Sequence, residues 1–219
     1  YRTGDLSHAY PLARSLPVVL VALISLALGR GDQIHPQAYV GFVAVTAGCI
    51  LLPLPKFSDF HLSQYRQKWI LFALLAAVCI TGYTLLDDQS LRILRSLPAT
   101  PLSNFGWALL FGELEAISIS LLLTVFILSW VPERRVLRQA SRSDWRIAAL
   151  TGLIITATYG LILLAMAYVS NVSYVLAFRQ MSIPIGAALG MLVRKEALYP
   201  PKLVGIGVVV AGLILVAVA

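Results

Sequence analysis

Long apolar runs, separated by short polar segments, dominate the pattern of this chain. Leu71–Ile80, for example, is continuously apolar, with no alternation of polar and apolar positions. A helix needs about 20 apolar residues to cross a bilayer, and open strands cannot satisfy their backbone hydrogen bonds in lipid. The pattern therefore predicts an all-α membrane protein with seven transmembrane helices. We place these helices at residues 11–29, 38–54, 69–86, 104–130, 147–169, 172–193 and 203–219.

Residues at the predicted helix ends agree with these boundaries. Pro36 precedes the second helix and Pro200 and Pro201 precede the seventh, and proline is tolerated in or before a first helical turn. All four tryptophans fall near predicted helix ends, as expected for residues that anchor at the membrane surface. These are Trp69, Trp107, Trp130 and Trp145.

The composition excludes a water-soluble globular enzyme. Of the 219 residues, 59% are hydrophobic and 12% are charged, whereas soluble domains are about half apolar and about a quarter charged. The net charge of +7 fits basic loops between membrane helices, so no nucleic-acid partner is expected. Cys49, Cys79 and the three histidines form no cluster, and no catalytic or nucleotide-binding motif occurs. We expect no metal, no cofactor and no enzymatic activity.

The loop charges are unevenly divided between the two sides of the membrane. Twelve of the 17 basic residues lie in predicted loops on the side of Tyr1, and three lie on the opposite side. The positive-inside rule would therefore place Tyr1 in the cytoplasm. Arg14 and Arg179 lie inside predicted helices and belong to neither count.

A shift of 164 residues reveals an internal repeat. It aligns residues 10–51 with residues 174–215 without a gap, and 13 of the 42 pairs are identical. Matches between apolar residues carry little weight, because both segments are rich in them. The informative pairs are Tyr10/Tyr174, Arg30/Arg194, Pro36/Pro200, Gly41/Gly205 and Gly48/Gly212, with Asp32/Glu196 matching in charge.

The repeat has an inverted sense. Its matched helices are five apart, and an odd offset places them in opposite orientation across the membrane. Inverted repeats are typical of secondary transporters, whose substrate site lies at mid-membrane between the halves. We therefore expect residues 1–55 to be the last two helices of a first five-helix repeat, 56–67 an inter-repeat loop, and 68–219 a complete second repeat. Three helices are then expected before Tyr1.

The sequence resembles the EamA-type members of the drug/metabolite transporter superfamily. The resemblance implies a ten-helix, five-plus-five fold that moves small metabolites, often outward, with both chain ends in the cytoplasm. That topology would place Tyr1 outside, against the loop charges, so orientation stays open. Gly29–Asp32 departs from the usual Gly-Glu pair of the family. The residues that carry the resemblance are Tyr10–Pro17, Asp32, Gly41 and Gly48, and then Arg179–Pro184, Arg194–Glu196, Gly205 and Gly212.

Two acidic residues lie deep inside the fourth predicted helix. Ionisable groups at membrane depth are costly and mark functional sites by default. Glu113 and Glu115 are two residues apart, about 200° around a helix, and cannot share one face. We expect one to face the transport pathway, where a low dielectric favours the neutral carboxyl and protonation can couple transport to a proton gradient. The alternative is a structural acid paired with Arg14 or Arg179.

The sixth predicted helix contains a second candidate group. Arg179 and Ser182 share a helical face and would line a substrate cavity, and Pro184 removes a backbone hydrogen bond and frees a carbonyl near Gln180. The alternative role for Arg179 is to reach the membrane surface or to pin a loop.

Arg14 and Pro17 are the approximate counterparts of this group in the first helix, although they do not follow the 164-residue register. Tyrosines offer hydroxyl groups or aromatic faces to a ligand, with anchoring at the membrane surface as the alternative. The candidates are Tyr10, Tyr159, Tyr168 and Tyr174.

Together these features predict a secondary transporter that moves a small metabolite or drug-like solute by alternating access, with efflux and proton coupling as expectations. A flippase for lipid headgroups or sugar-lipids on the same fold is the alternative. A membrane-embedded enzyme is disfavoured, because no nucleophile or metal cluster lies at the helix ends. We expect a multi-pass protein of a bacterial inner membrane and leave a homodimer open. The 219-residue chain by itself is not expected to transport.

Overall fold

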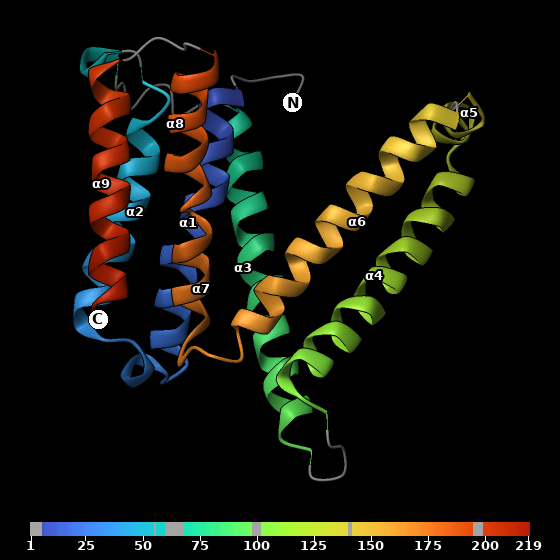
Figure 1. The fold of residues 1–219 in the computed structure, drawn as a ribbon, viewed down its shortest axis with the longest axis horizontal. Helices are drawn as coiled ribbons and strands as arrows, with labels where there is room; N and C mark the ends of the chain where they lie inside the picture. Colours follow the sequence, from blue (N-terminus) through green and yellow to red (C-terminus); the bar gives the residue numbers. More distant parts are fainter. Residues whose placement is uncertain (1–5, 55, 60–67, 98–101, 140–141, 195–198) are drawn as a thin grey trace. The chain divides into compact units, whose positions relative to one another are not determined.

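The chain is helical throughout its regular structure. The computed structural model describes residues 6–54, 56–59, 68–97, 102–139, 142–194 and 199–219, and every regular element among them is a helix (Figure 1). This confirms the predicted all-α class over the described residues. The α-helices are α1 (Leu6–Ala27), α2 (Pro36–Leu51), α3 (Lys68–Arg95), α4 (Asn104–Ser129), α5 (Val131–Gln139), α6 (Arg142–Ala165), α7 (Val172–Arg179), α8 (Ser182–Arg194) and α9 (Pro200–Ala217), and short 3₁₀ helices are η1 (Gly31–Gln33) and η2 (Phe57–Asp59).

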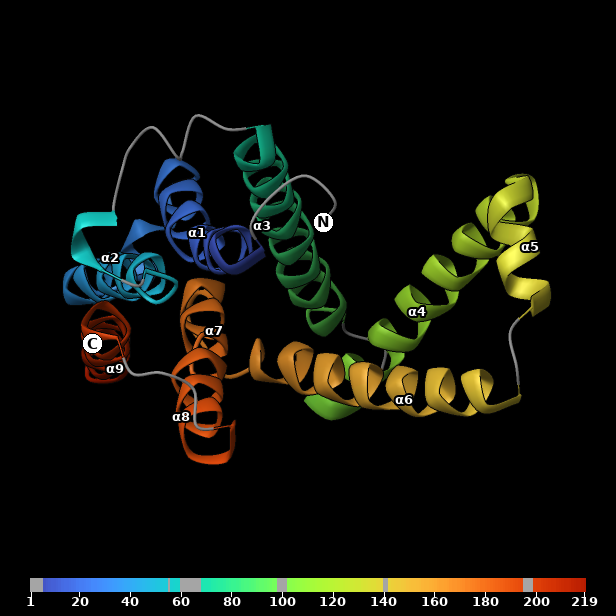
Figure 2. The ribbon, with the colours of Figure 1, turned by 90° about the horizontal axis from the view of Figure 1, so that it is seen from above.

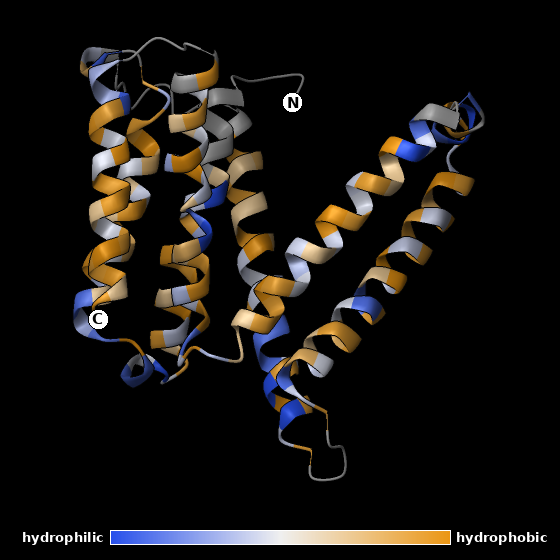
Figure 3. Cartoon of the chain, viewed as in Figure 1, coloured by the Kyte–Doolittle hydropathy of each residue, from blue (hydrophilic) through white to orange (hydrophobic). Residues whose placement is uncertain are grey.

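Five helical segments are long and apolar enough to cross a membrane. They are Ile70–Arg95, Asn104–Ser129, Asp144–Ala165, Val172–Gly190 and Pro200–Ala217. The other two predicted helices correspond to shorter apolar helices, Ala13–Ala27 and Pro36–Leu51. Orange apolar colouring covers most of the length of these helices in Figure 3. The protein is therefore an integral, multi-pass membrane protein, while the count of seven membrane helices stays a prediction.

Helix α3 continues well past the predicted end of its apolar run. The prediction ends at residue 86, but the helix extends to Arg95. The added turns carry an ion pair four residues apart, in which Arg92 Nε donates to Asp88 Oδ2 at 2.8 Å. This spacing favours a helix, so charged residues continue the helix beyond the apolar run.

Two further boundaries differ from the prediction. Helix α5 lies where a loop is expected between the fourth and fifth predicted helices. The sixth predicted helix is interrupted at residues 180–181, which separate α7 from α8. Hydropathy measures transfer into lipid and carries little information about backbone conformation at either place.

The described helices belong to two compact units. The first unit contains Tyr1–Leu86 and Val169–Ala219, and the second unit contains Asp87–Tyr168. In the first unit, α2 and α9 lie side by side (Figures 1 and 2). In the second unit, α4 packs against α6, and a Cβ atom built on Gly112 would lie 3.1 Å from Leu163 Cδ1.

Four glycines allow the backbones of α2 and α9 to approach closely. A Cβ atom on Gly41 would lie 2.7 Å from the carbonyl oxygen of Gly212, and one on Gly212 would lie 2.8 Å from that of Gly41. Gly48 and Gly205 oppose each other in the same way, with both distances at 2.8 Å. Cβ atoms do not approach backbone this closely, so a side chain at any of these positions would separate the helices. Small residues serve this purpose at helix contacts in membranes.

We expect Gly48→Ala to destabilise the protein by about 1–3 kcal/mol, because the added methyl group overpacks the contact between α2 and α9. Thermal unfolding in detergent, followed by intrinsic fluorescence, measures the effect. Gly207→Ala is the matched control, since Gly207 is exposed on α9 and a Cβ atom there meets nothing within 4 Å. Equal unfolding temperatures for the two variants would show that the close approach is not required.

Candidate functional site

The break between α7 and α8 follows from Pro184. Proline has no N–H, so it cannot donate to the carbonyl of Gln180, four residues earlier. That carbonyl accepts instead from the Ile183 N–H at 2.9 Å. The bond withdraws the Ile183 N–H from Arg179, whose carbonyl is its normal α-helical partner. The carbonyl released from the helical ladder is thus that of Arg179, the residue directly before Gln180.

Side chains from α1 and α8 take up the released carbonyl. Ser182 Oγ donates to the Arg179 oxygen at 3.0 Å, and Arg14 Nη2 reaches the same oxygen at 3.5 Å. Arg14 Nη2 also donates to Ser182 Oγ at 3.0 Å, and Gln180 Nε2 donates to the Arg14 carbonyl at 3.0 Å. We call Arg14, Arg179, Gln180 and Ser182 the break cluster. The structure thus brings the predicted residues Arg14 and Ser182 into direct contact.

The side chain of Arg179, unlike its carbonyl, takes no part in the hydrogen bonds of the break cluster. It is half-buried, and its guanidinium makes no hydrogen bond or ion pair with any residue that the structure describes.

Helix α1 runs without interruption through Pro17, so this proline does not act as a helix break in the way that Pro184 does. One missing backbone bond is tolerated where neighbouring groups preserve the helix.

Of Tyr10 and Tyr174, which the 164-residue shift aligns, Tyr174 has a described side chain. Its hydroxyl accepts a hydrogen bond from the His35 N–H at 3.0 Å, and its ring meets Phe42 edge-on at 5.8 Å between centroids. These contacts attach α7 to the start of α2. Tyr10 lies in α1, but its side chain is outside the described part of the chain.

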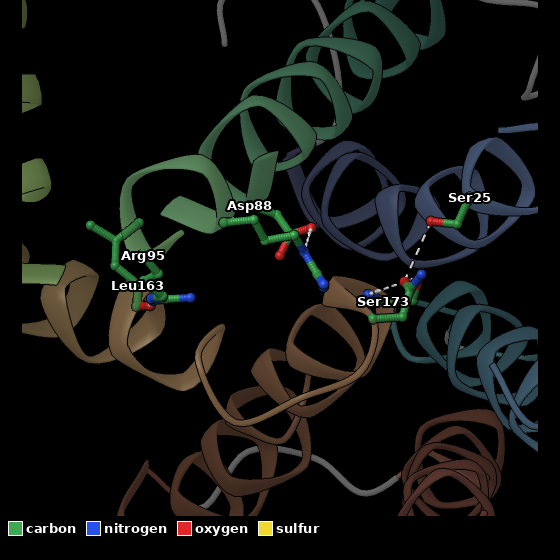
Figure 4. A network of polar contacts seen from close by, with 7 residues as sticks. Ser25, Asp88, Arg95, Leu163 and Ser173 are labelled. Carbon is green, nitrogen blue, oxygen red and sulfur yellow. Dashed lines mark hydrogen bonds and ion pairs between the residues drawn. The ribbon is translucent and has the colours of Figure 1, made fainter. Parts of the chain in front are cut away.

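The start of α7 is also held by buried polar groups (Figure 4). Asn171 caps the helix by accepting from the Ser173 N–H at 3.0 Å and from Ser173 Oγ at 2.7 Å. Ser25 Oγ of α1 donates to the same Asn171 oxygen at 3.4 Å. All three side chains are buried. The first turn of α7 is therefore anchored to α1, as its last turn is through the break cluster.

The second unit contains a different polar group, which we call the acid–tyrosine cluster: Asp87, Glu115 and Tyr159. The Tyr159 hydroxyl donates to Asp87 Oδ2 at 2.5 Å and lies 3.4 Å from Glu115 Oε1. Asp87 is 5% exposed. Glu115 Oε2 is buried and accepts no hydrogen bond from the described residues. A single hydroxyl proton is thus placed between two carboxyl groups and lies nearer to Asp87.

Glu113 and Glu115 occupy different environments. Glu113 is exposed, whereas Glu115 is half-buried and approaches Tyr159. Their spacing around α4 accounts for the difference, since two residues along a helix turn about 200°. Of the two predicted acids, Glu115 is the one within a polar cluster.

Sequence reasoning missed the charged end of α3. Asp87 and Asp88 are both buried, and Arg95 Nη2 donates to the Leu163 carbonyl at 3.3 Å (Figure 4). Hydropathy ends the helix at residue 86 and so assigns these residues to a loop. The four-residue spacing of Asp88 and Arg92 is the signal that would have extended the helix.

Comparison with known proteins identifies the family. The sequence model described as the EamA-like transporter family matches residues 67–218, which is more than half of the chain. The chain belongs to the EamA-like transporter family. The matched segment of this EamA protein contains the whole acid–tyrosine cluster and every residue of the break cluster except Arg14. No curated protein and no solved structure gives a significant match.

Membership in this family has direct consequences for function. This EamA protein is a membrane transporter of small solutes, with a small-molecule substrate and a lipid bilayer as its surroundings. The family consists of transporters rather than enzymes. Polar groups within its membrane helices are therefore to be interpreted in terms of solute movement.

We expect Ser182→Ala to lower stability by about 1 kcal/mol, because the Arg179 carbonyl loses a donor and the Arg14 guanidinium loses an acceptor. Thermal unfolding in detergent checks this. Ser118→Ala is the control, since Ser118 Oγ donates only to the Leu114 carbonyl of its own helix and is exposed. A loss no larger than that of the control would contradict a bridging role for Ser182.

Proposed function

We propose that this protein is a secondary transporter that works by alternating access, with its substrate site at the break cluster. The observation that carries the proposal is the interrupted membrane helix α7–α8. Substrate sites of secondary transporters are typically formed by discontinuous membrane helices, in which released backbone groups and half-helix ends face the ligand. The interruption lies inside the apolar segment Val172–Gly190. The carbonyl released from the helical ladder, the Ser182 hydroxyl and the two arginines of the break cluster lie at this point.

The contacts between α2 and α9 support an inverted repeat. Under the 164-residue shift, Gly41 corresponds to Gly205 and Gly48 to Gly212. The contact of Gly41 with Gly212 then becomes the contact of Gly205 with Gly48, so the two contacts exchange. Reciprocal contacts of this kind are what a two-fold axis requires. A pseudo-two-fold axis in the membrane plane relates the halves of inverted-repeat transporters.

The neighbours of the four glycines follow the same exchange. A Cβ atom on Gly48 would meet the backbone nitrogen of Val209, and one on Gly212 would meet that of Val45, both at 2.8 Å. Val45 and Val209 are themselves partners under the shift. The family match to residues 67–218 also begins and ends one residue before the predicted second repeat, 68–219. Both observations favour the five-plus-five arrangement and, with it, rocking of one repeat against the other.

The break cluster favours a substrate with an anionic group. The guanidinium of Arg179 has no partner among the described residues. Arg14 is held at the first turn of α8 by its hydrogen bond to Ser182 Oγ. The N-terminus of a helix carries a partial positive charge, and arginine binds carboxylate and phosphate groups in a bidentate manner. A carboxylate or phosphate of a small metabolite would complete this site.

The acid–tyrosine cluster supports proton coupling. When Tyr159 donates to Asp87, Glu115 Oε1 has no proton from that hydroxyl, and Glu115 Oε2 has no donor among the described residues. A proton on Glu115 would allow it to donate to the Tyr159 oxygen, while Tyr159 continues to donate to Asp87. We therefore assign the coupling proton to Glu115, with Tyr159 and Asp87 holding the carboxyl in place.

We expect Arg179→Gln to reduce uptake of the substrate about tenfold or more, because charge-assisted hydrogen bonds to an anion are worth about 1.5–3 kcal/mol. The assay uses vesicles containing the protein expressed from its native gene and a panel of radiolabelled carboxylates, phosphates, neutral solutes and amines. Arg179→Lys keeps the charge and should retain part of the uptake of an anionic substrate. Transport of neutral solutes or amines that is indifferent to both substitutions would refute the anionic site but leave the transporter intact.

We expect Glu115→Gln to abolish stimulation of uptake by an imposed pH gradient, because an amide cannot take up the proton. Infrared spectroscopy of the purified protein provides a readout that needs no substrate. The pH-dependent carbonyl stretch of a protonated carboxylic acid should disappear in Glu115→Gln. Glu113→Gln, two residues away and exposed, should retain both the stimulation and the band. Loss in both variants, or in neither, would refute the assignment to Glu115.

A further inference from the structure

Helix α5 joins two helices that can cross the membrane. It begins at Val131, directly after α4 ends at Ser129, and α6 follows at Arg142. Because α4 and α6 each traverse the bilayer, their connection has to lie at a membrane surface. Trp130 and Trp145 flank α5 and are 55% and 56% exposed, as expected for residues that anchor at the boundary between headgroups and acyl chains.

One face of α5 is turned toward the ends of its two neighbours. Glu133, Val136 and Leu137 recur at spacings of three and four residues, which places them on one helical face. They line a cavity of about 260 Å³ together with residues of α4 and α6, among them Ile127 and Trp145. Val136 is nevertheless 65% exposed. This face is largely apolar and is only partly covered by the protein.

The connection between α4 and α6 carries an excess of positive charge. Residues 131–146 contain five arginines and two acids. Both acids, Glu133 and Asp144, line the cavity. Arg134 and Arg135 precede the cavity-lining pair Val136 and Leu137, and Arg135 and Arg146 are exposed. Figure 3 shows the hydrophilic colouring concentrated at this end of the apolar α4 and α6 helices.

We propose that α5 lies in the plane of the membrane surface and binds anionic phospholipid headgroups through Arg134 and Arg135. An amphipathic helix with arginines on its polar face binds anionic lipid by combining burial of its apolar face with electrostatic attraction. Clusters of four to eight basic residues next to a membrane helix are typical of such sites. The apolar face near Val136 would meet the acyl chains, and the arginines would meet the phosphates. This proposal does not depend on the transport mechanism.

Quenching of tryptophan fluorescence by brominated lipids tests the proposal. The protein carries Trp69→Phe and Trp107→Phe, so that Trp130 and Trp145 beside α5 are the tryptophans retained among residues 1–219. It is reconstituted in phosphatidylcholine with a small fraction of brominated phosphatidylglycerol or, for comparison, brominated phosphatidylcholine. We expect stronger quenching by the anionic lipid, weakened by salt because surface charges are screened.

Substitutions separate the role of the arginines from a general effect of charge. Each arginine removed should lower the local enrichment of anionic lipid about fivefold, the equivalent of about 1 kcal/mol. Arg134→Gln with Arg135→Gln should therefore abolish most of the preference, and the matching lysine variant should retain it. Equal quenching by the two lipids, or a preference unchanged in the glutamine variant, would overturn the proposal.

Discussion

A peptide group in hydrocarbon has no water to bond, so each backbone N–H and C=O in a membrane span needs a partner within the protein. The interruption between α7 and α8 is where this constraint is most demanding. Pro184 removes one donor, Ile183 shifts to Gln180, and the Arg179 carbonyl is left over. Ser182 and Arg14 then supply the missing donors. A break that would otherwise destabilise the helix thereby becomes a polar site held in a defined position.

The buried carboxyl groups of the second unit likewise need hydrogen-bond donors within the protein. Asp87 and Asp88 are buried, and each has a described donor, Tyr159 for the first and Arg92 for the second. Glu115 approaches the same tyrosine but is not the nearer acceptor. Asp87 therefore receives the hydroxyl proton of Tyr159, whereas Glu115 Oε2, like Asp88 Oδ1, is buried and has no donor among the described residues.

Much of the architecture could be read from the sequence. Hydropathy located the apolar helices, and the glycines that the 164-residue shift aligns are those at which α2 and α9 meet. Hydropathy failed at α5 and at the charged end of α3, because it scores transfer into lipid and not backbone conformation. The sequence predicts Arg14, Ser182 and Glu115 as site residues, but it does not predict Asp87. An acid just beyond an apolar run looks like a loop residue until the helix is known to continue.

The sequence by itself determined that this is a helical membrane protein, because transfer into lipid depends on residue types alone. Only the tertiary structure decided which side chains form hydrogen bonds with one another. Arg14 meets Ser182 across 168 positions of sequence, and Asp87 meets Tyr159 across 72. Contacts this distant are set by how helices pack and turn, and the order of residues along one helix does not encode the rotation of its neighbour.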